Sequence, residues 1–242
     1  MNISNNTILI TGGATGIGLG LTERFLKENN KVIICGRRES VLQEVKAKYP
    51  SVIIKQCDVA IPAEREALYN WISEEHKDVN VLINNAGVQQ DRPLDNIDFY
   101  LHAKEEIAIN IEAPIHLSSL FLNLKSLNTI MNVTSGLAFT PLAKAHVYSA
   151  TKAFMRSFTL SLRNLVKDKN IDVIEIIPPA LNTDLGGKGV HNYAPPVSDF
   201  IETIFEQLKA GKKELTFGFS AAMLSSGPED LQKAFERMNG GN

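Results

Sequence analysis

The chain has 242 residues, of which 44% are hydrophobic and 21% are charged; this composition is typical of a globular protein and excludes a disordered or fibrous chain. With 25 Lys and Arg against 27 Asp and Glu, the net charge of -2 shows no basic surplus that would indicate nucleic acid or an anionic membrane surface as a partner. Two cysteines are too few for a disulfide framework, and no apolar stretch is long enough to span a membrane, so we expect a cytoplasmic protein without membrane insertion.

Short runs of apolar and β-branched residues recur along the chain, and each is mostly apolar rather than alternating with polar residues. This pattern is typical of strands that are buried on both faces of a sheet. In chain order, the expected strands are 7–11, 32–35, 52–56, 79–83, 129–134, 171–177 and, as the weakest, 214–217.

Amphipathic helical stretches separate these runs, and strands that alternate with helices form βαβ units and a parallel sheet. The expected helices are 17–29, 39–48, 62–76, 97–122, 148–168, 198–210 (with Ser198 as its N-cap) and 228–238. Because no shift in composition marks a domain boundary, we expect one α/β domain over residues 1–242. The segment 180–197 is glycine- and proline-containing and long for a compact domain, so it predicts a lid over substrate or cofactor.

A glycine-rich turn follows the first strand and leads directly into a helix. The glycines stand at Gly12, Gly16 and Gly18, with Thr15 and Ile17 between them. Glycine permits positive φ and a close approach of backbone to a ligand, and a helix N-terminus attracts a pyrophosphate. The turn therefore predicts a dinucleotide site; the alternative is a tight turn without a ligand.

The end of the second strand indicates which dinucleotide is bound. An acidic residue there binds the ribose 2′-hydroxyl of NAD, whereas arginine accommodates the 2′-phosphate of NADP. Here the strand ends with Gly36, Arg37 and Arg38, and guanidinium groups bind phosphate bidentately. We therefore expect NADP(H) rather than NAD(H), although a solvated basic pair is the alternative. Asp58, after the third strand, is placed to contact the adenine amino group or to serve only as a turn residue.

Tyr148 and Lys152 are four residues apart in a helical stretch and so share one face. A nearby ammonium favours phenolate and lowers the tyrosine pKa, so this pair can exchange a proton with a carbonyl oxygen. Ser135 ends the fifth strand, where its hydroxyl can donate to the same oxygen as negative charge develops there. Taken singly, each of these residues fits an ordinary structural position as well.

Asn110 lies in the long helical stretch four residues before Pro114, which has no N–H. The carbonyl of Asn110 therefore needs another partner, and a water there would suit a proton relay; a hydrated structural kink is the alternative. After the fourth strand, Asn85, Ala86 and Gly87 would let the backbone approach the cofactor closely.

The motifs T-G-x-x-x-G-I-G at 11–18, Asp58-Val59, N-N-A-G at 84–87, Asn110, Ser135 and Y-S-A-T-K at 148–152 stand in one order, and chance would rarely place them all. Over residues 5–218 the chain resembles the short-chain dehydrogenases/reductases. The resemblance implies a Rossmann-like three-layer α/β/α sandwich with a seven-stranded parallel sheet. Within the family, several stretches look like the bacterial DltE-type reductases.

The resemblance implies a catalytic tetrad in which Tyr148 is the acid/base and Lys152 holds the nicotinamide ribose. Ser135 would hold the substrate carbonyl, and Asn110 would anchor a water relay. Thr183 and the backbone of Leu181 would lie near the nicotinamide carboxamide, after Pro178. The family usually has glycine where this chain has Pro179, which puts that path in question.

We therefore expect an oxidoreductase that transfers a hydride between NADP(H) and a small carbonyl or alcohol substrate, without a metal ion. An apolar cleft is suggested by Leu137, Ala138, Phe139, Leu142 and Ala143, with Leu185 on the predicted lid; a subunit contact or a core position is the alternative for these residues. The resemblance suggests a homodimer or homotetramer. A non-catalytic NADPH-binding sensor or scaffold is the alternative. An epimerase or dehydratase of the extended type is disfavoured, because few residues follow the last expected strand.

Overall fold

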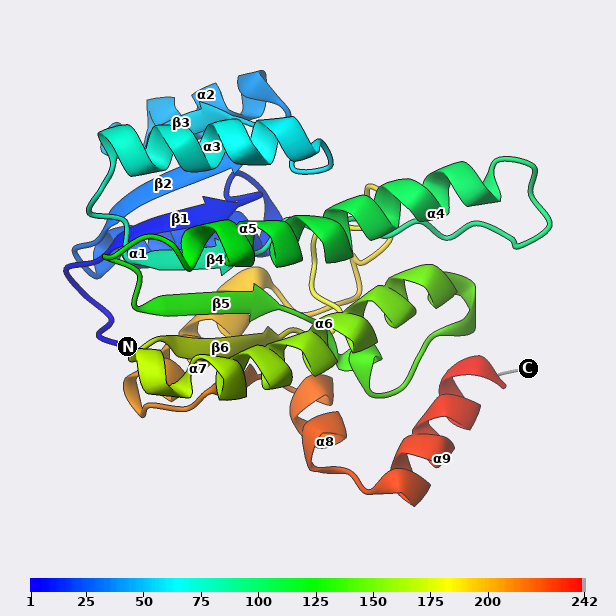
Figure 1. The fold of residues 1–242 in the computed structure, drawn as a ribbon. Helices are drawn as coiled ribbons and strands as arrows, with labels where there is room; N and C mark the ends of the chain where they lie inside the picture. Colours follow the sequence, from blue (N-terminus) through cyan, green and yellow to red (C-terminus); the bar gives the residue numbers. More distant parts are fainter. Residues whose placement is uncertain (241–242) are drawn as a thin grey trace.

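The computed structural model describes residues 1–240, and its centre is a single sheet of parallel strands (Figure 1). The strands lie in the order β3-β2-β1-β4-β5-β6-β7, so successive crossovers run outward in opposite directions from β1 and β4. Their bounds are β1 Thr7–Thr11, β2 Lys31–Gly36, β3 Ile53–Gln56, β4 Val81–Asn84, β5 Thr129–Val133, β6 Asp172–Ile177 and β7 Glu214–Thr216.

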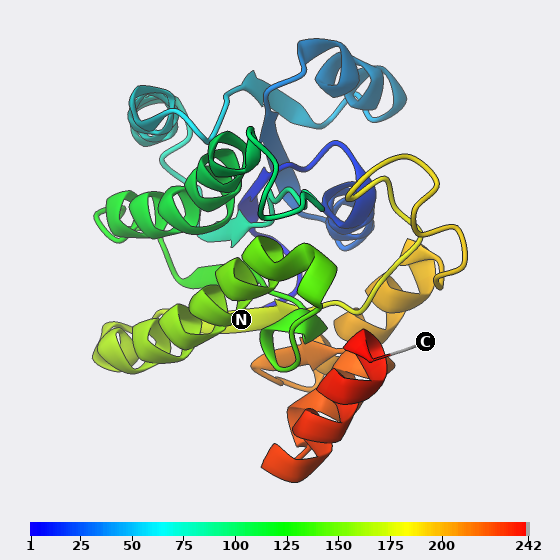
Figure 2. The same ribbon diagram turned by 90° about the vertical axis from the view of Figure 1, so that its right-hand side faces the viewer.

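Helices cover both faces of the sheet and complete a three-layer α/β/α sandwich (Figure 2). One core forms beneath α1 (Gly16–Lys27), α2 (Glu39–Lys48) and α7 (Val197–Lys209). The other forms beneath α3 (Pro62–Glu75), α5 (Ala113–Phe121) and α6 (His146–Leu165). The predicted Rossmann-like fold with seven parallel strands is confirmed.

Burial on both faces explains the continuous apolar strands. Successive side chains of a strand point to opposite faces, and accordingly Ile8 and Ile10 lie in the first core while Leu9 lies in the second. All three side chains are fully buried. A polar residue at any of these positions would enter a helix-covered core, which is why alternation is absent from the sequence.

The stretch 97–122, predicted as one helix, contains a change of helical type. It consists of α4 (Phe99–Ile107), a π-helical turn over Ala108–Glu112, and α5. The N–H of Ala113 donates to the carbonyl of Ala108, five residues back. Pro114 follows at once and offers no N–H to continue the ordinary ladder. The expected departure from helical bonding around Asn110 is therefore present.

Two details of the predicted helices are wrong. Helix α7 begins one residue before Ser198, and its N-cap is Pro196, whose φ of -66° and extended ψ suit that position. The hydroxyl of Ser198 instead donates to Asp199. The short helix α8 (Phe219–Ser225) was not expected, whereas α9 (Pro228–Asn239) lies where a final helix was predicted.

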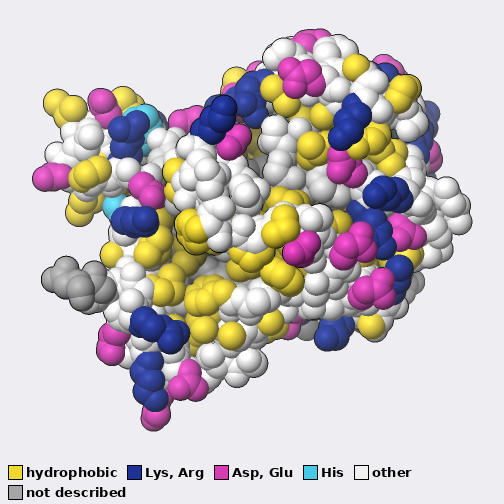
Figure 3. Space-filling view, turned by 180° about the vertical axis from the view of Figure 1, so that it is seen from behind, with side chains coloured by type: hydrophobic (Ala, Val, Ile, Leu, Met, Phe, Trp, Pro, Cys, Tyr) yellow, Lys and Arg dark blue, Asp and Glu magenta, His cyan; other side chains and the backbone are white. Residues whose placement is uncertain are grey.

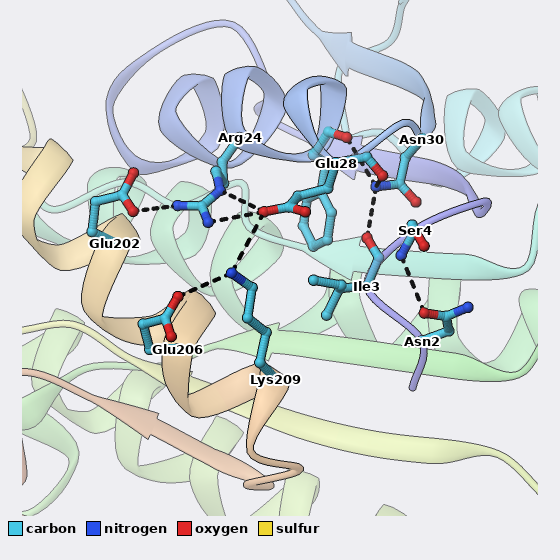
Figure 4. Close-up of polar contacts among 10 residues, drawn as sticks. Asn2, Ile3, Ser4, Arg24, Glu28, Asn30, Glu202, Glu206 and Lys209 are labelled. Carbon is cyan, nitrogen blue, oxygen red and sulfur yellow. Dashed lines mark hydrogen bonds and ion pairs between the residues drawn. The ribbon is translucent and has the colours of Figure 1, made fainter.

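Charged side chains tie α1 to α7 at the rim of the first core (Figure 4). Arg24 donates to both Glu28 and Glu202, and Lys209 lies 3.0 Å from Glu206 and 3.9 Å from Glu28. The Arg24 guanidinium also lies 4.7 Å from the ring centroid of Phe205, which packs on Phe25. These contacts hold α1, which follows the glycine turn, against α7, which follows the segment 180–197.

None of the helices between residues 1 and 240 combines the length and apolar character that a membrane span requires. Within the same residues, no group of three or more His, Cys, Asp or Glu side chains is arranged to hold a metal ion.

We expect Leu21→Ala to lower the free energy of unfolding by about 2–5 kcal/mol, because it leaves a cavity in the first core. Leu21 is 1% exposed. The matched control is Leu165→Ala, at a leucine that is 73% exposed, where the change should stay within about 0.5 kcal/mol. Urea denaturation measures both, and equal effects would contradict the placement of α1 on this core.

Candidate active site

A cavity of about 1270 Å³ opens at the carboxyl ends of the strands, where ligands bind in open parallel sheets. It gathers residues from every element that the motifs marked. Of the predicted site residues, the following line it: Gly12, Thr15, Gly16, Ile17, Gly18, Arg37, Arg38, Asp58, Val59, Asn85, Ala86, Gly87, Ser135, Tyr148, Lys152, Pro178, Leu181 and Thr183. Asn110 is the one that does not.

The glycine turn has the geometry of an anion cradle. Gly12 and Gly16 have φ of +64° and +52°, and a Cβ on Gly18 would lie 2.1 Å from the carbonyl oxygen of Gly12. Helix α1 begins at Gly16 and has no acidic residue in its first turn. Its free N–H groups and the positive end of its dipole therefore face the cavity, which suits a pyrophosphate.

Hydrogen bonds from the loop after β4 hold this turn in place. The Thr11 hydroxyl accepts the backbone N–H groups of Asn85 and Ala86, each at 3.0 Å. The Asn85 amide donates to the carbonyls of Thr11 and Gly12 at 2.9 and 3.1 Å. These hydrogen bonds therefore join the carboxyl ends of β1 and β4, the point from which the chain continues toward opposite edges of the sheet.

The arginine pair lies at one end of the cavity. Arg37 is half-exposed, and its guanidinium lies 3.2 Å from Glu105 of α4. The sequence did not indicate this partner, because the two residues are 68 positions apart. Exposed pairs of this kind contribute at most about 1 kcal/mol, so an incoming phosphate can compete for the guanidinium.

Asp58 lines the same end of the cavity and also caps its own turn. Its carboxylate accepts the N–H of Ala60 at 3.0 Å, and its backbone N–H donates to Glu64 at 2.6 Å. The structural role considered for Asp58 is therefore present, and its contact with an adenine stays a prediction.

Tyr148, Lys152 and Ser135 meet at the centre of the cavity. Tyr148 and Lys152 lie one turn apart on α6, and the ammonium is 5.4 Å from the centroid of the phenol ring. The ammonium donates to the carbonyl of Val133 at 2.9 Å, at the end of β5. The Ser135 hydroxyl accepts the N–H of Leu137 at 3.1 Å, which fixes the start of the next turn.

Burial controls the protonation of these groups. It raises the pKa of Tyr148 well above its usual value, against a smaller lowering by the interaction with Ser135. It lowers the pKa of Lys152 to about 8, against a raising effect of Glu106. The expected lowering of the tyrosine pKa by Lys152 is wrong for this ligand-free site, since the cost of a buried phenolate dominates.

Asn110 acts through its side chain rather than at the cavity surface. Its amide oxygen accepts the N–H of Val88 at 3.0 Å, and its amide nitrogen donates to the Val88 carbonyl and the Thr151 hydroxyl at 2.9 and 3.1 Å. A Cβ on Gly87 would lie 3.4 Å from that amide oxygen and 3.5 Å from the Lys152 nitrogen. Asn110 thus fastens the loop after β4 to α6 beside Lys152.

The consecutive prolines after β6 do not divert the chain from the cavity. The Pro178 carbonyl accepts the N–H of Gly136 at 3.0 Å, next to Ser135. A Cβ on Gly16 would lie 3.4 Å from the Thr183 methyl group, so the loop returns over the glycine turn. Leu181 and Thr183 both line the cavity despite the Pro179 departure.

The far end of the cavity is largely apolar, and hydrophobic side chains spread over the hollowed face in Figure 3. Leu137, Leu142, Tyr193, Phe219 and Met238 lie on this side. Among residues 1–240, the lysine and arginine side chains that line the cavity are Arg37, Arg38 and Lys152. Of the residues predicted to form an apolar cleft, Leu137, Leu142 and Leu185 line this cavity. The other three, Ala138, Phe139 and Ala143, do not.

Helix α8 also contacts the turn that follows Ser135, which the sequence did not indicate. A Cβ on Gly136 would lie 2.9 Å from the Ser220 hydroxyl and 3.0 Å from the Phe219 ring. Helix α8 therefore packs directly on the residue after Ser135. Only the small size of Gly136 hints at this contact.

Comparison with known proteins gives a consistent result. The family model described as short chain dehydrogenase matches residues 6–194. An oxidoreductase named DltE from Bacillus subtilis strain 168 is 42% identical, over 99% of this chain and 98% of its own.

Among solved structures, a short chain dehydrogenase from Burkholderia cenocepacia in complex with NADP has a TM-score of 0.85 and 24% identity, and the match covers 98% of this chain and 99% of that one. A serine dehydrogenase complexed with NADP+ has a TM-score of 0.78 and 27% identity, over 87% and 94% of the chains. These matches agree with the family resemblance carried by the motifs.

We expect Gly18→Ala to destabilise the protein by about 1–3 kcal/mol and to abolish nucleotide binding, because the new methyl group would overlap the Gly12 carbonyl. Gly227→Ala is the matched control, since a Cβ there meets nothing within 4 Å. Thermal unfolding and fluorescence titration with NADPH measure the two effects. Normal binding by Gly18→Ala would show that the turn does not hold the nucleotide.

Proposed function

We propose that this chain, which belongs to the short chain dehydrogenase family of oxidoreductases, interconverts a carbonyl and an alcohol with NADP(H). The observation that carries the proposal is one cavity in which Tyr148, Ser135 and Lys152 stand between a glycine cradle and an apolar wall. If the glycine cradle and these three side chains had only structural roles, there would be no reason for them to occur in the same cavity.

The cavity fits a phosphorylated dinucleotide. The glycine turn would hold the pyrophosphate, Arg37 and Arg38 the 2′-phosphate, and Lys152 the nicotinamide ribose. Position 36 at the end of β2 is a glycine, so there is no carboxylate to bind the free ribose 2′-hydroxyl of NAD. The NADP+ in the similar serine dehydrogenase supports this choice. When bound, NADP(H) would supply or accept the hydride.

Tyr148 and Ser135 would act on the substrate oxygen. In reduction, the Tyr148 hydroxyl gives its proton to the carbonyl oxygen while the Ser135 hydroxyl donates a hydrogen bond to the same atom. Because the pKa of Tyr148 is raised, it keeps this proton throughout the neutral range. The resting site is therefore set for reduction, and the reverse direction requires removal of that proton.

Asn110 would support this chemistry by position. Its side chain joins Val88 to Thr151 on α6, one residue from Lys152. We propose that its carbonyl, in the π-helical turn before Pro114, holds a water that carries protons between Lys152 and solvent.

The substrate we propose is an uncharged carbonyl compound with an apolar substituent. The similar serine dehydrogenase is named for serine, an amino acid that carries a carboxylate. Among residues 1–240, the apolar end of this cavity has no arginine or lysine to pair with a carboxylate. Unpaired charge in such a site costs several kcal/mol, which disfavours an acid as substrate.

We further propose that the loop 180–197 closes over the bound ligands, since its residues Thr183 and Tyr193 line the cavity. A homodimer or homotetramer would use exposed apolar side chains of α4 and α6, which include Tyr100, Leu101 and Phe154.

We expect NADPH to bind at least about tenfold more tightly than NADH, a difference of roughly 1.4 kcal/mol. Arg37→Asp should remove this preference, because it replaces the phosphate partner by a like charge. Arg92→Asp, at an exposed arginine outside the cavity, is the control. Fluorescence titration measures all three proteins, and equal affinity of the parent for the two nucleotides would reject the NADP assignment.

We expect Tyr148→Phe to lower the rate of carbonyl reduction about 10²–10⁴-fold, because it removes the proton donor. NADPH affinity should stay within about twofold, since the ring still fills its place. NADPH oxidation with a panel of uncharged ketones and aldehydes measures the rate. Unchanged turnover would reject Tyr148 as the acid, and tight NADPH binding by the parent without turnover would favour a sensor or scaffold.

A further inference from the structure

Glu106 is a buried carboxyl group beside the proposed catalytic residues, yet no step above uses it. It lies on α4, one turn before Asn110, and is 1% exposed. Its carboxylate interacts with the backbone N–H of Gln90, while Oε1 has no hydrogen-bond partner among the described residues. A buried glutamate is costly unless another charge compensates it.

The compensating charge is Lys152. Helix α4 packs against α6, which carries Lys152 and Tyr148. The loop after β4 lies against both groups: the Gln90 N–H interacts with the Glu106 carboxylate, and a Cβ on Gly87 would lie 3.5 Å from the Lys152 nitrogen. In this arrangement the positive charge of Lys152 favours the ionised form of Glu106, and the negative charge of Glu106 favours the ionised form of Lys152. The interaction between the two side chains is Coulombic and does not include a hydrogen bond.

Resting on the function proposed above, we propose that Glu106 is a positioning residue that keeps the Lys152 side chain positively charged inside the buried site. Among residues 1–240, the Lys152 ammonium has one hydrogen bond, to the neutral carbonyl of Val133. The carboxylate thus supplies the negative charge that the cavity wall lacks at this point. Tyr148 and the nicotinamide ribose would both depend on that ammonium.

Other titratable groups around Glu106 do not supply this charge balance. Burial is the main reason that the pKa of Glu106 is raised to about 7, and the acidic groups Asp91 and Glu105 add to the increase. From α6, Tyr148 stays protonated in the neutral range, and His146 stacks on Phe99 of α4 at 5.3 Å. His102 lies on α4 itself and faces the cavity.

The loss of Glu106 should show mainly on the alkaline side of the activity profile. With the carboxylate, the pKa of Lys152 is about 8. Without it, burial acts alone and the ammonium loses its proton at lower pH. A residue that merely fills space would instead change the rate equally at all pH values.

We expect Glu106→Gln to move the alkaline limb of kcat for NADPH-dependent carbonyl reduction to lower pH by about 1 unit, while the rate at pH 6 stays within about threefold. Glu112→Gln, at an exposed glutamate in the same helical stretch, is the control and should not shift the limb. A Glu106→Gln profile that superimposes on the parent's, or that drops uniformly without shifting, would overturn the proposal.

A second measurement needs no turnover and so separates this proposal from the proposed function. In the ligand-free protein, a double-mutant cycle of Glu106→Gln and Lys152→Met should show a favourable coupling in Tm of about 2 °C or more at pH 7.5. The coupling should vanish at pH 5, where Glu106 is protonated. Coupling that is absent at both pH values, or equal at both, would overturn the proposal even in an inactive parent.

Discussion

The bond between the ends of β1 and β4 is the constraint on which the site depends. At this point the crossovers leave toward opposite edges of the sheet, and a crevice opens between them. The Thr11 hydroxyl and the Asn85 amide close the gap with four hydrogen bonds. They hold the start of α1 at a fixed distance from the loop that leads to Gly87. The glycine turn is therefore held in a fixed position relative to Asn110 and Lys152, which lie beside that loop.

Burial then determines the pKa values of the ionisable side chains in this site. The same low exposure that raises the pKa of Tyr148 lowers the pKa of Lys152 and raises that of Glu106. Burial thus shifts Tyr148, Lys152 and Glu106 toward their neutral forms together. Tyr148 keeps its proton at neutral pH, whereas the pKa values of about 7 for Glu106 and about 8 for Lys152 leave both of these groups partly charged there.

Much of the fold could be predicted because strands buried on both faces leave continuous apolar runs, as in Leu9 between Ile8 and Ile10. The motif residues were predictable for the same reason, since strand ends meet at one edge. The role of Glu106 was not, because nothing in the local sequence distinguishes it from the half-buried Glu105 beside it. Its burial depends on how α4 packs against α6, and no pattern within α4 specifies that contact. The pairing of Arg37 with Glu105 likewise arises only when the chain folds.

The contact of α8 with Gly136 has a consequence for how the chain acquires its function during synthesis. The nucleotide half of the cavity is encoded before residue 195, whereas Phe219 and Met238 are made last. The turn after Ser135 therefore leaves the ribosome well before the α8 side chains that pack on it, and this part of the cavity is complete only when the final segment has been made. On the function proposed above, substitutions at Phe219 or Met238 would change the apolar wall without changing the glycine turn.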